Sequence, residues 1–338
     1  MARGGKLKPA TRERRAGMRL FAAVVLLAVG AVVPAAAFDP AVPQAGRSAV
    51  LLSWDGVGRE RLRDLLAAGR LPGVSALVRN GSLVGIDVTG HRTDTKAGHA
   101  EMLTGYGPGV TGVHSNTRFR PIPAGLSIFE VLQRRFGSGR IATIMVTAKT
   151  SNLGSAGPGF LKPGEPWHLV RPGLTVWDGD TVRDASVVGP RALAGLRRFA
   201  AQRFFAFFHF RDADAAGHRE GERSPGYTEA IITCDRWLAA IVAELKALSI
   251  DRRTMVFVTA DHGFDPGARV HRNAPRVFLA TDDPAVVRSG DQRDIVPTLL
   301  AEMGADPAAV RPRLAGRPLT GPPATPELRP PGQPRMIR

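Results

Sequence analysis

The sequence predicts an α/β domain with a mostly parallel central sheet between layers of helices. Four continuous apolar runs suit buried strands, at residues 48–54, 141–146, 203–210 and 254–259. Helical patterns alternate with them at residues 58–68, 98–103, 127–136, 192–200 and 227–248. Runs that are apolar throughout are typical of parallel strands covered on both faces. With 338 residues, 43% of them hydrophobic, the chain can bury the core that such a domain needs.

Residues 1–37 have the three-part pattern of a secretory signal peptide. Basic residues precede the apolar run 21–33, and Pro34 and three alanines follow it. We therefore expect cleavage near Ala37, export to the periplasm or the medium, and no stable membrane span in the mature protein. An uncleaved anchor is the alternative, although the run is shorter than the ~20 residues of a spanning helix. The pair Arg14-Arg15 leaves Sec and twin-arginine export both open.

The charge of the expected mature protein indicates an anionic partner. Loss of residues 1–37 removes seven Lys/Arg and one acid, which lowers the formal charge from +16 to +10. This balance suits a small phosphorylated substrate. Specific nucleic-acid binding is not expected, because the arginines are scattered and only two tyrosines offer a stacking surface. Residues 321–338 are rich in proline and predict a tail, so the expected catalytic domain spans 38–320; the oligomeric state stays open.

Three of the apolar runs lead into acids. Asp55 follows the run 48–54, Asp214 lies shortly after the run 203–210, and Asp261 follows the run 254–259. Asp-Gly is also ordinary turn chemistry, and a plain turn is the alternative for Asp55 or Asp261 taken singly. In parallel sheets, however, ligands bind outside the carboxyl ends of the strands. Three acids at equivalent ends therefore predict one shared site.

Three histidines accompany these acids and indicate a metal site. They are His218, four residues after Asp214, then His262, next to Asp261, and finally His271. Mixed imidazole and carboxylate ligands suit zinc, manganese or iron better than calcium or magnesium. Six such residues exceed the four ligands of one structural zinc. We expect two divalent metal ions, zinc in the first place, and an open catalytic position.

The segment 91–105, HRTDTKAGHAEMLTG, offers a nucleophile. Its spacing after Thr95 predicts the first turns of a helix, so an N-cap role for the Thr95 hydroxyl is one interpretation. The functional interpretation uses the same position, because free N–H groups at a helix N-terminus attract an anion such as phosphate. A threonine hydroxyl is a poor nucleophile until coordination to a metal activates it.

The run Thr95-Lys96-Ala97-Gly98-His99-Ala100-Glu101-Met102-Leu103-Thr104-Gly105 resembles the nucleophile motif of the alkaline phosphatase superfamily. This superfamily includes sulfatases, nucleotide pyrophosphatase/phosphodiesterases and phosphopentomutase. The resemblance extends from Asp55 to about Gly304 and includes the closing segment 294–300, DIVPTLL. It implies an alkaline phosphatase-like fold. Only about 97 residues separate Asn116 from Asp214, so we expect a single domain without a large cap.

The resemblance also implies roles for individual residues. One metal would be held by Asp55, Thr95, Asp261 and His262, and the other by Asp214, His218 and His271. Thr95 would be transiently phosphorylated, and water would then hydrolyse the phosphothreonine. In the phosphodiesterase branch an asparagine 21 residues after the nucleophile donates a hydrogen bond to a phosphate oxygen, and Asn116 has that place. The expected function is therefore an exported two-metal phosphodiesterase or nucleotide pyrophosphatase.

Other functions stay open from the sequence. Some exported monoesterases of the superfamily place a lysine and an arginine on the phosphate, and this chain offers Lys149 but has Ser151 at the arginine position. Lys149 is thus a candidate substrate-binding residue, with a surface lysine as the alternative. A sulfatase needs a formylglycine made from Cys or Ser, which Thr95 cannot supply. The string around Gly98-His99 is similar to phosphopentomutase, which has a cap domain. A non-catalytic, metal-stabilised anion-binding module is the last alternative.

Overall fold

A computed structural model describes residues 46–149, 166–167, 169–170, 173–179 and 182–321. The predicted signal peptide lies outside these residues, and so does the predicted tail except Gly321. The boundaries predicted for both segments therefore stay predictions. No helix in the described part of the chain is long and apolar enough to cross a membrane.

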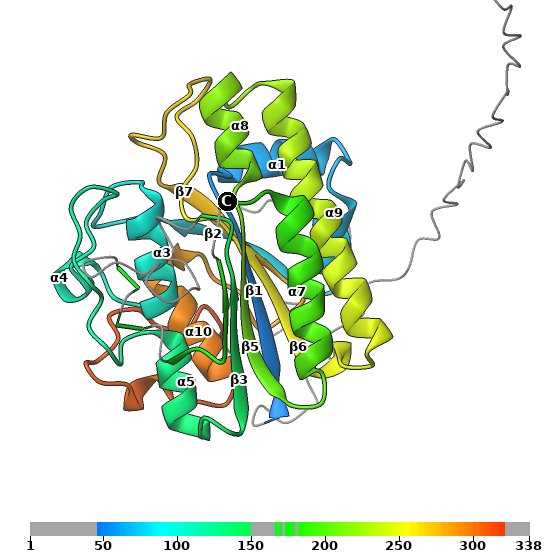
Figure 1. The fold of residues 1–338 in the computed structure, drawn as a ribbon. Helices are drawn as coiled ribbons and strands as arrows, with labels where there is room; N and C mark the ends of the chain where they lie inside the picture. Colours follow the sequence, from blue (N-terminus) through cyan, green and yellow to red (C-terminus); the bar gives the residue numbers. More distant parts are fainter. Residues whose placement is uncertain (1–45, 150–165, 168, 171–172, 180–181, 322–338) are drawn as a thin grey trace, which may run out of the picture. The chain divides into compact units, whose positions relative to one another are not determined.

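An eight-stranded sheet forms the centre of the described body, with the order β4-β3-β5-β1-β6-β7-β2-β8 (Figure 1). Among these strands, only β7 runs antiparallel to its neighbours. The predicted mostly parallel sheet is therefore confirmed. The strands are β1 (Ser48–Trp54), β2 (Ser82–Asp87), β3 (Ile141–Val146), β4 (Val176–Asp178), β5 (Arg203–Phe210), β6 (Thr254–Thr259), β7 (Arg276–Thr281) and β8 (Gly290–Asp291).

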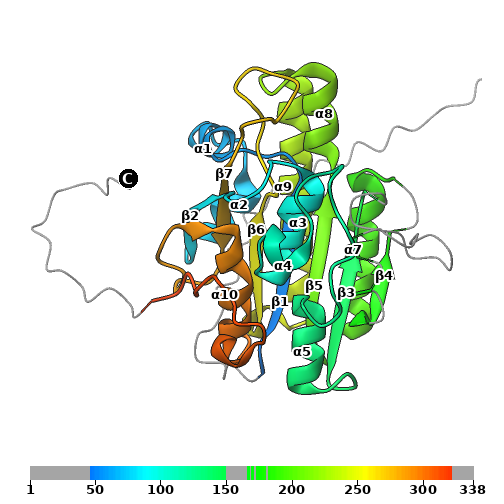
Figure 2. The same cartoon turned by 90° about the vertical axis from the view of Figure 1, so that its left-hand side faces the viewer.

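Helices cover both faces of the sheet, as predicted (Figures 1 and 2). One face carries α1 (Arg59–Ala67), α2 (Pro72–Val78), α7 (Ala185–Phe199) and α9 (Pro225–Ala247), with α8 (Asp212–Glu220) packed on α9. The other face carries α3 (Thr95–Thr104), α4 (Pro108–Thr111), α5 (Ile128–Phe136) and α10 (Ile295–Glu302). Short 3-10 turns lie at η3 (Asp251–Arg253), η4 (Gln292–Asp294) and η5 (Pro307–Ala309). The described residues thus form a single α/β domain.

Three predicted helices begin earlier than expected. The helix predicted at 227–248 starts at Pro225, the helix predicted at 98–103 at Thr95, and the helix predicted at 192–200 at Ala185. In the last case the side chain of Asp184 accepts a hydrogen bond from the Ser186 N–H and caps the helix, which then continues through Pro190. Between Asn116 and Asp214, the described elements α5, β3, β4 and α7 all belong to the sheet or its helical layers. Within the described ranges there is thus no separate cap.

The carboxyl ends of β1, β3, β5 and β6 lie at one edge of the sheet, because these strands are neighbours and parallel. β1 pairs in register with both β5 and β6, so that Ser53 lies opposite His209 on one side and Thr259 on the other. The segments that follow the strands therefore converge on one place. This geometry brings together Asp55, Lys149, Asp214 and Asp261.

Asp282, which is not one of these four residues, gives a prediction about the stability of the fold. Its Oδ1 accepts a hydrogen bond from the Val256 N–H at 2.8 Å, and burial raises its pKa from 3.8 to about 8. The folded protein thus keeps a proton that the unfolded chain loses at lower pH. The free energy of unfolding should therefore fall between about pH 5 and 8, by at most about 1.4 kcal/mol per pH unit from this group.

Asp282→Asn keeps the acceptor oxygen and removes the titration. We expect its free energy of unfolding to vary less with pH than that of the wild type, in urea titrations across this pH range. Equal slopes in the two proteins would contradict the prediction.

Candidate active site

Asp55 follows β1 directly and is fully buried. The turn behind it requires glycine, because Gly56 has a φ of +77° and a Cβ there would lie 2.8 Å from the Phe264 ring and 3.1 Å from the Asp214 Cα. The Gly56 N–H donates a hydrogen bond to Asp261 Oδ1 at 3.1 Å. The turns after β1 and β6 thus hold each other in place.

Thr95 is the first residue of α3, and Asp94 is the N-cap residue. The N-cap interpretation of the Thr95 hydroxyl was therefore wrong. Thr95 Oγ1 instead lies 3.4 Å from His262 Nε2 and 3.3 Å from Lys149 Nζ. Thr95 is 1% exposed, so its hydroxyl is buried beside His262 and Lys149. A hydroxyl placed in this way is available for chemistry.

Asn116 lies against the first turn of α3. Its Oδ1 accepts a hydrogen bond from the Lys96 N–H at 2.9 Å, and its own N–H donates to Asp94 Oδ2 at 3.0 Å. Because a backbone N–H can only donate, the side-chain oxygen of Asn116 must face Lys96. The Nδ2 group is then the part of the amide that is left to donate to a ligand.

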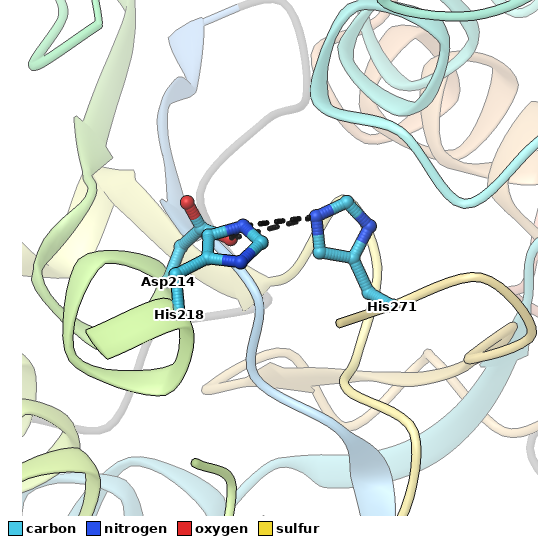
Figure 3. A group of neighbouring side chains, drawn as sticks. All are labelled: Asp214, His218 and His271. Carbon is cyan, nitrogen blue, oxygen red and sulfur yellow. Dashed lines mark hydrogen bonds and ion pairs between the residues drawn. The ribbon is translucent and has the colours of Figure 1, made fainter. Parts of the chain in front are cut away.

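Asp214, His218 and His271 form one group that could hold a metal, and their ligand atoms lie within 4.8 Å of one another. Asp214 and His218 lie on α8, and His271 approaches them from the loop between β6 and β7 (Figure 3). His218 Nε2 lies 3.3 Å from Asp214 Oδ1 and 3.1 Å from His271 Nε2. The structure thus brings together the three residues that were predicted as one ligand set.

Asp55, Asp214 and His262 form a second possible metal group by the same geometric measure. The other two residues predicted for this set lie beside it, since Thr95 Oγ1 and Asp261 Oδ2 are each 3.4 Å from His262 Nε2. Asp214 therefore takes part in both groups, whereas the sequence-based prediction gave it to one. The reason is that Asp214, in the first turn of α8, lies against Gly56 in the turn after β1, while its Oδ1 is 3.9 Å from His271 Nε2.

The three imidazoles present the same nitrogen to the site. The Nδ1 atoms of His262, His271 and His218 lie 2.9, 2.6 and 2.9 Å from the carbonyl oxygens of Gly263, Thr93 and Arg269. In the neutral ring Nδ1 therefore carries the proton, and the Nε2 lone pair faces the site. Metal-binding histidines are normally oriented by such a bond. Two lone pairs 3.1 Å apart, on His218 and His271, also need a cation or a proton between them.

Three carboxylate oxygens at the site have no hydrogen-bond partner among the described residues, although each is buried. They are Asp55 Oδ1, Asp214 Oδ1 and Asp261 Oδ2. Buried carboxyl oxygens without a partner are costly, so each of them is a place where a cation would stabilise the fold. Each also lies within 3.7 Å of an imidazole Nε2. The donor set fits divalent ions of the zinc type.

Lys149 enters the same space from the segment after β3. Its Nζ lies 2.8 Å from Asp55 Oδ2, 2.6 Å from Asp214 Oδ2 and 3.3 Å from Thr95 Oγ1. The side chain is 12% exposed, so the alternative of a surface lysine was wrong. Burial alone would lower the pKa of this amine, but Asp55 and Asp214 outweigh it and raise the pKa above its usual value. Lys149 is therefore a largely buried cation.

The charges at the site shift the pKa values of the acids in opposite directions. Burial raises the pKa of Asp55, but Lys149 and a hydrogen bond from His209 outweigh it, and the net pKa is well below the usual range. Burial and the negative charge of Asp55 raise the pKa of Asp261 well above its usual range. Without further cations the site thus favours an ionised Asp55 and a neutral Asp261.

Two buried histidines beneath the site were not predicted as part of it. His209, on β5, lies with Nε2 2.8 Å from Asp55 Oδ2, and its Nδ1 accepts from the Ala148 N–H at 3.3 Å. His99, on α3, lies 2.8 Å from both Ser53 Oγ and the Thr95 carbonyl oxygen. Burial lowers the pKa of both imidazoles, which are therefore neutral. The available signal was a histidine inside the otherwise apolar run 203–210.

Gly98 allows α3 to lie against the end of β6. A Cβ at this position would lie 2.5 Å from the Asp261 carbonyl oxygen and 3.0 Å from the Asp261 Cβ. Gly98→Ala should therefore push Thr95 away from His262, and we expect kcat for a phosphate ester to fall about 100-fold, because such losses follow a shift of about 1 Å. Gly109→Ala is the matched control, since a Cβ there meets no atom within 4 Å. Equal rates for the two variants would refute the prediction.

Comparison with a family model decides the family. Residues 49–291 match the model of the type I phosphodiesterase / nucleotide pyrophosphatase family. The chain belongs to this family. The matched range contains every predicted site residue, and membership indicates an enzyme that hydrolyses phosphate esters. No curated protein matches the chain by sequence.

Solved structures agree on the fold at low sequence identity. The lipoteichoic acid synthase LtaP from Listeria monocytogenes is similar with a TM-score of 0.58 and 14% identity, over 81% of this chain and 76% of that one. The phosphonate monoester hydrolase SpPMH from Silicibacter pomeroyi has a TM-score of 0.55 and 15% identity, over 81% and 75%. Murine ectonucleotide pyrophosphatase / phosphodiesterase 5 has a TM-score of 0.55 and 14% identity, over 77% of this chain and 95% of that one. The alkaline phosphatase-like fold is thereby confirmed.

Proposed function

We propose that the protein is an exported two-metal phosphodiesterase in which Thr95 is the nucleophile. The observation that carries the proposal is the position of the Thr95 hydroxyl, 3.4 Å from His262 Nε2, which itself lies 3.4 Å from Asp261 Oδ2, a buried oxygen that lacks a hydrogen-bond partner among the described residues. Asp55, Asp261 and His262 would hold one ion with Thr95, and Asp214, His218 and His271 the other; Asp214 would also reach the first ion, because it forms a group with Asp55 and His262 as well. Bound divalent ions would supply charge stabilisation to the attacking and leaving oxygens and favour the threonine alkoxide.

The protein's own groups then have distinct tasks. Thr95 Oγ attacks phosphorus, the bond from phosphorus to the leaving oxygen breaks, and the product is a phosphothreonine ester and an alcohol. Water then cleaves the ester at phosphorus and regenerates the hydroxyl. Asn116 is suited to donate from Nδ2 to a non-bridging phosphate oxygen, because its Oδ1 already accepts from Lys96. The first turn of α3 adds the positive end of a helix dipole.

A panel of esters tests this proposal. Metal-loaded mature protein is assayed with bis-p-nitrophenyl phosphate, p-nitrophenyl phosphate and p-nitrophenyl sulfate under the same conditions. We expect the diester to be cleaved fastest. Faster cleavage of the monoester would make the protein a phosphomonoesterase, faster cleavage of the sulfate a sulfatase, and no cleavage of any ester would favour the anion-binding module.

The choice of zinc needs its own measurement. Dialysis against a chelator should abolish diester hydrolysis, and about two equivalents of Zn²⁺ per chain should restore it. Manganese and iron are the comparison ions, since the same ligand types bind them. Restoration by calcium or magnesium alone would contradict the zinc assignment.

Export is supported by residues 1–37 only. The full-length protein, expressed in a bacterium with a periplasm, should be recovered outside the cytoplasm with Phe38 as its first residue. Intact residues 1–37 in a membrane fraction would instead support the uncleaved anchor.

A further inference from the structure

The ammonium of Lys149 has no donor left for a substrate. An ammonium group carries three N–H donors. Two of them are directed at Asp55 Oδ2 and Asp214 Oδ2, and the third is within reach of Thr95 Oγ1. All three partners belong to the protein. These contacts therefore favour a role other than the substrate binding that the sequence suggested.

In both carboxylates beside Lys149, the two oxygens have different surroundings. Asp55 Oδ2 and Asp214 Oδ2 face Lys149, whereas both Oδ1 atoms lack hydrogen-bond partners within the described part of the chain. Asp55 Oδ1 lies 3.7 Å from His262 Nε2, and Asp214 Oδ1 lies 3.3 Å from His218 Nε2. Each carboxylate thus has one oxygen tied to the lysine and one turned toward the imidazoles.

We propose that Lys149 is a positioning residue that ties Asp55 to Asp214 and thereby aims one oxygen of each at the two metal positions. The inference rests on the proposed two-metal function. A carboxylate is planar, so fixing Oδ2 by a charge-assisted hydrogen bond also fixes the direction of Oδ1. One ammonium shared by the two carboxylates also sets the spacing between the two metal groups.

The two metal groups depend on Lys149 to different degrees. Asp55 Oδ2 has a second partner in His209 Nε2 at 2.8 Å, whereas Lys149 is the hydrogen-bond donor that the structure records for Asp214 Oδ2 among the described residues. Without the ammonium, Asp55 keeps one contact that orients it. Asp214 keeps none at this oxygen. The group of Asp214, His218 and His271 should therefore weaken most, because Asp214 is its one carboxylate, whereas the other group also has Asp55 and Asp261.

Lys149→Met tests the inference, because methionine has a similar length and no charge. Calorimetric titration of the chelator-treated protein with Zn²⁺ should show two equivalents in the wild type. In the variant, one equivalent should weaken about 10- to 100-fold, as is typical when an outer partner of a metal ligand is lost, while the other changes less. At saturating Zn²⁺, the inhibition constant of inorganic phosphate and the KM for bis-p-nitrophenyl phosphate should stay within about twofold, since Lys149 contacts no substrate in this role.

Removal of the positive charge of Lys149 would by itself strengthen the binding of a cation. The direction of the change in Zn²⁺ affinity is therefore decisive. Unchanged or tighter Zn²⁺ binding, or a raised phosphate inhibition constant with normal Zn²⁺ binding, would overturn the inference and return Lys149 to the substrate. Lys149→Arg is the second variant if the methionine protein does not fold. It keeps a cation and should retain Zn²⁺ binding better than Lys149→Met; equal losses would count against the inference. Absence of Zn²⁺ binding in the wild type would instead refute the proposed function.

Discussion

Thr95→Ala should lower kcat for bis-p-nitrophenyl phosphate by at least about a thousandfold, because losses of this size follow removal of a covalent nucleophile. The hydroxyl is the one group at the start of α3 that faces both His262 and Lys149. Alanine removes the attacking oxygen and leaves the helix intact. Steady-state release of p-nitrophenol at saturating metal measures the effect. Thr95→Ser should retain part of the activity, since it keeps a hydroxyl at the same place.

Thr104→Ala is the matched control for this prediction. It makes the same change at the other end of the same helix, where Thr104 Oγ1 donates to the Ala100 carbonyl oxygen at 2.6 Å. We expect near wild-type turnover from this variant. Activity in Thr95→Ala comparable to that of Thr104→Ala would exclude the covalent mechanism and leave direct attack by water.

Asp214→Asn should cause the other large loss, because Asp214 belongs to both possible metal groups. An amide has no negative charge, and its NH₂ group would have to face either Lys149 or the imidazoles. We expect both metal equivalents to weaken and kcat at moderate metal concentration to fall about a thousandfold. His218→Asn, by contrast, alters one group only. Zn²⁺ titration of the two variants should show loss of two equivalents in the first and of one in the second.

Asp212→Asn is the control for the change of charge. Asp212 lies two residues before Asp214 on α8, and its Oδ1 accepts a hydrogen bond from the Ala185 N–H at 3.1 Å. The asparagine keeps this acceptor, so metal binding and turnover should persist. A pattern in which Asp214→Asn loses one equivalent only would contradict the shared position of Asp214.

The central strands could be predicted from the sequence to the residue. β1, β3, β5 and β6 have the predicted bounds, because each is almost fully buried and is apolar over most of its length. The strands that were missed carry weaker signals. β4 and β8 have three and two residues, and β2 is only half-buried over its first positions. β7 is buried but runs antiparallel to its neighbours. A simple alternation of strands and helices predicts parallel strands and does not predict this one.

One part of the site could be predicted from a single rule, namely that neighbouring parallel strands place their carboxyl ends together. That rule brings Asp55, Asp214 and Asp261 to one edge without any knowledge of strand order. The position of Lys149 depends on β3 being the neighbour of β5, which the sequence does not state. The membership of Asp214 in both possible metal groups depends on how α8 starts. The contact of His209 with Asp55 depends on the register of β5 with β1. These are tertiary relations between segments far apart in the chain.

Covalent trapping tests the central claim most directly. Metal-loaded protein is mixed with excess bis-p-nitrophenyl phosphate, quenched in acid within the first turnover and digested, and its peptides are weighed by mass spectrometry. If Thr95 is the nucleophile, the peptide that contains it carries a p-nitrophenyl phosphate group, and one equivalent of p-nitrophenol has been released. An adduct on another residue, or full turnover without any adduct in either the wild type or a variant with slowed hydrolysis, would contradict the account.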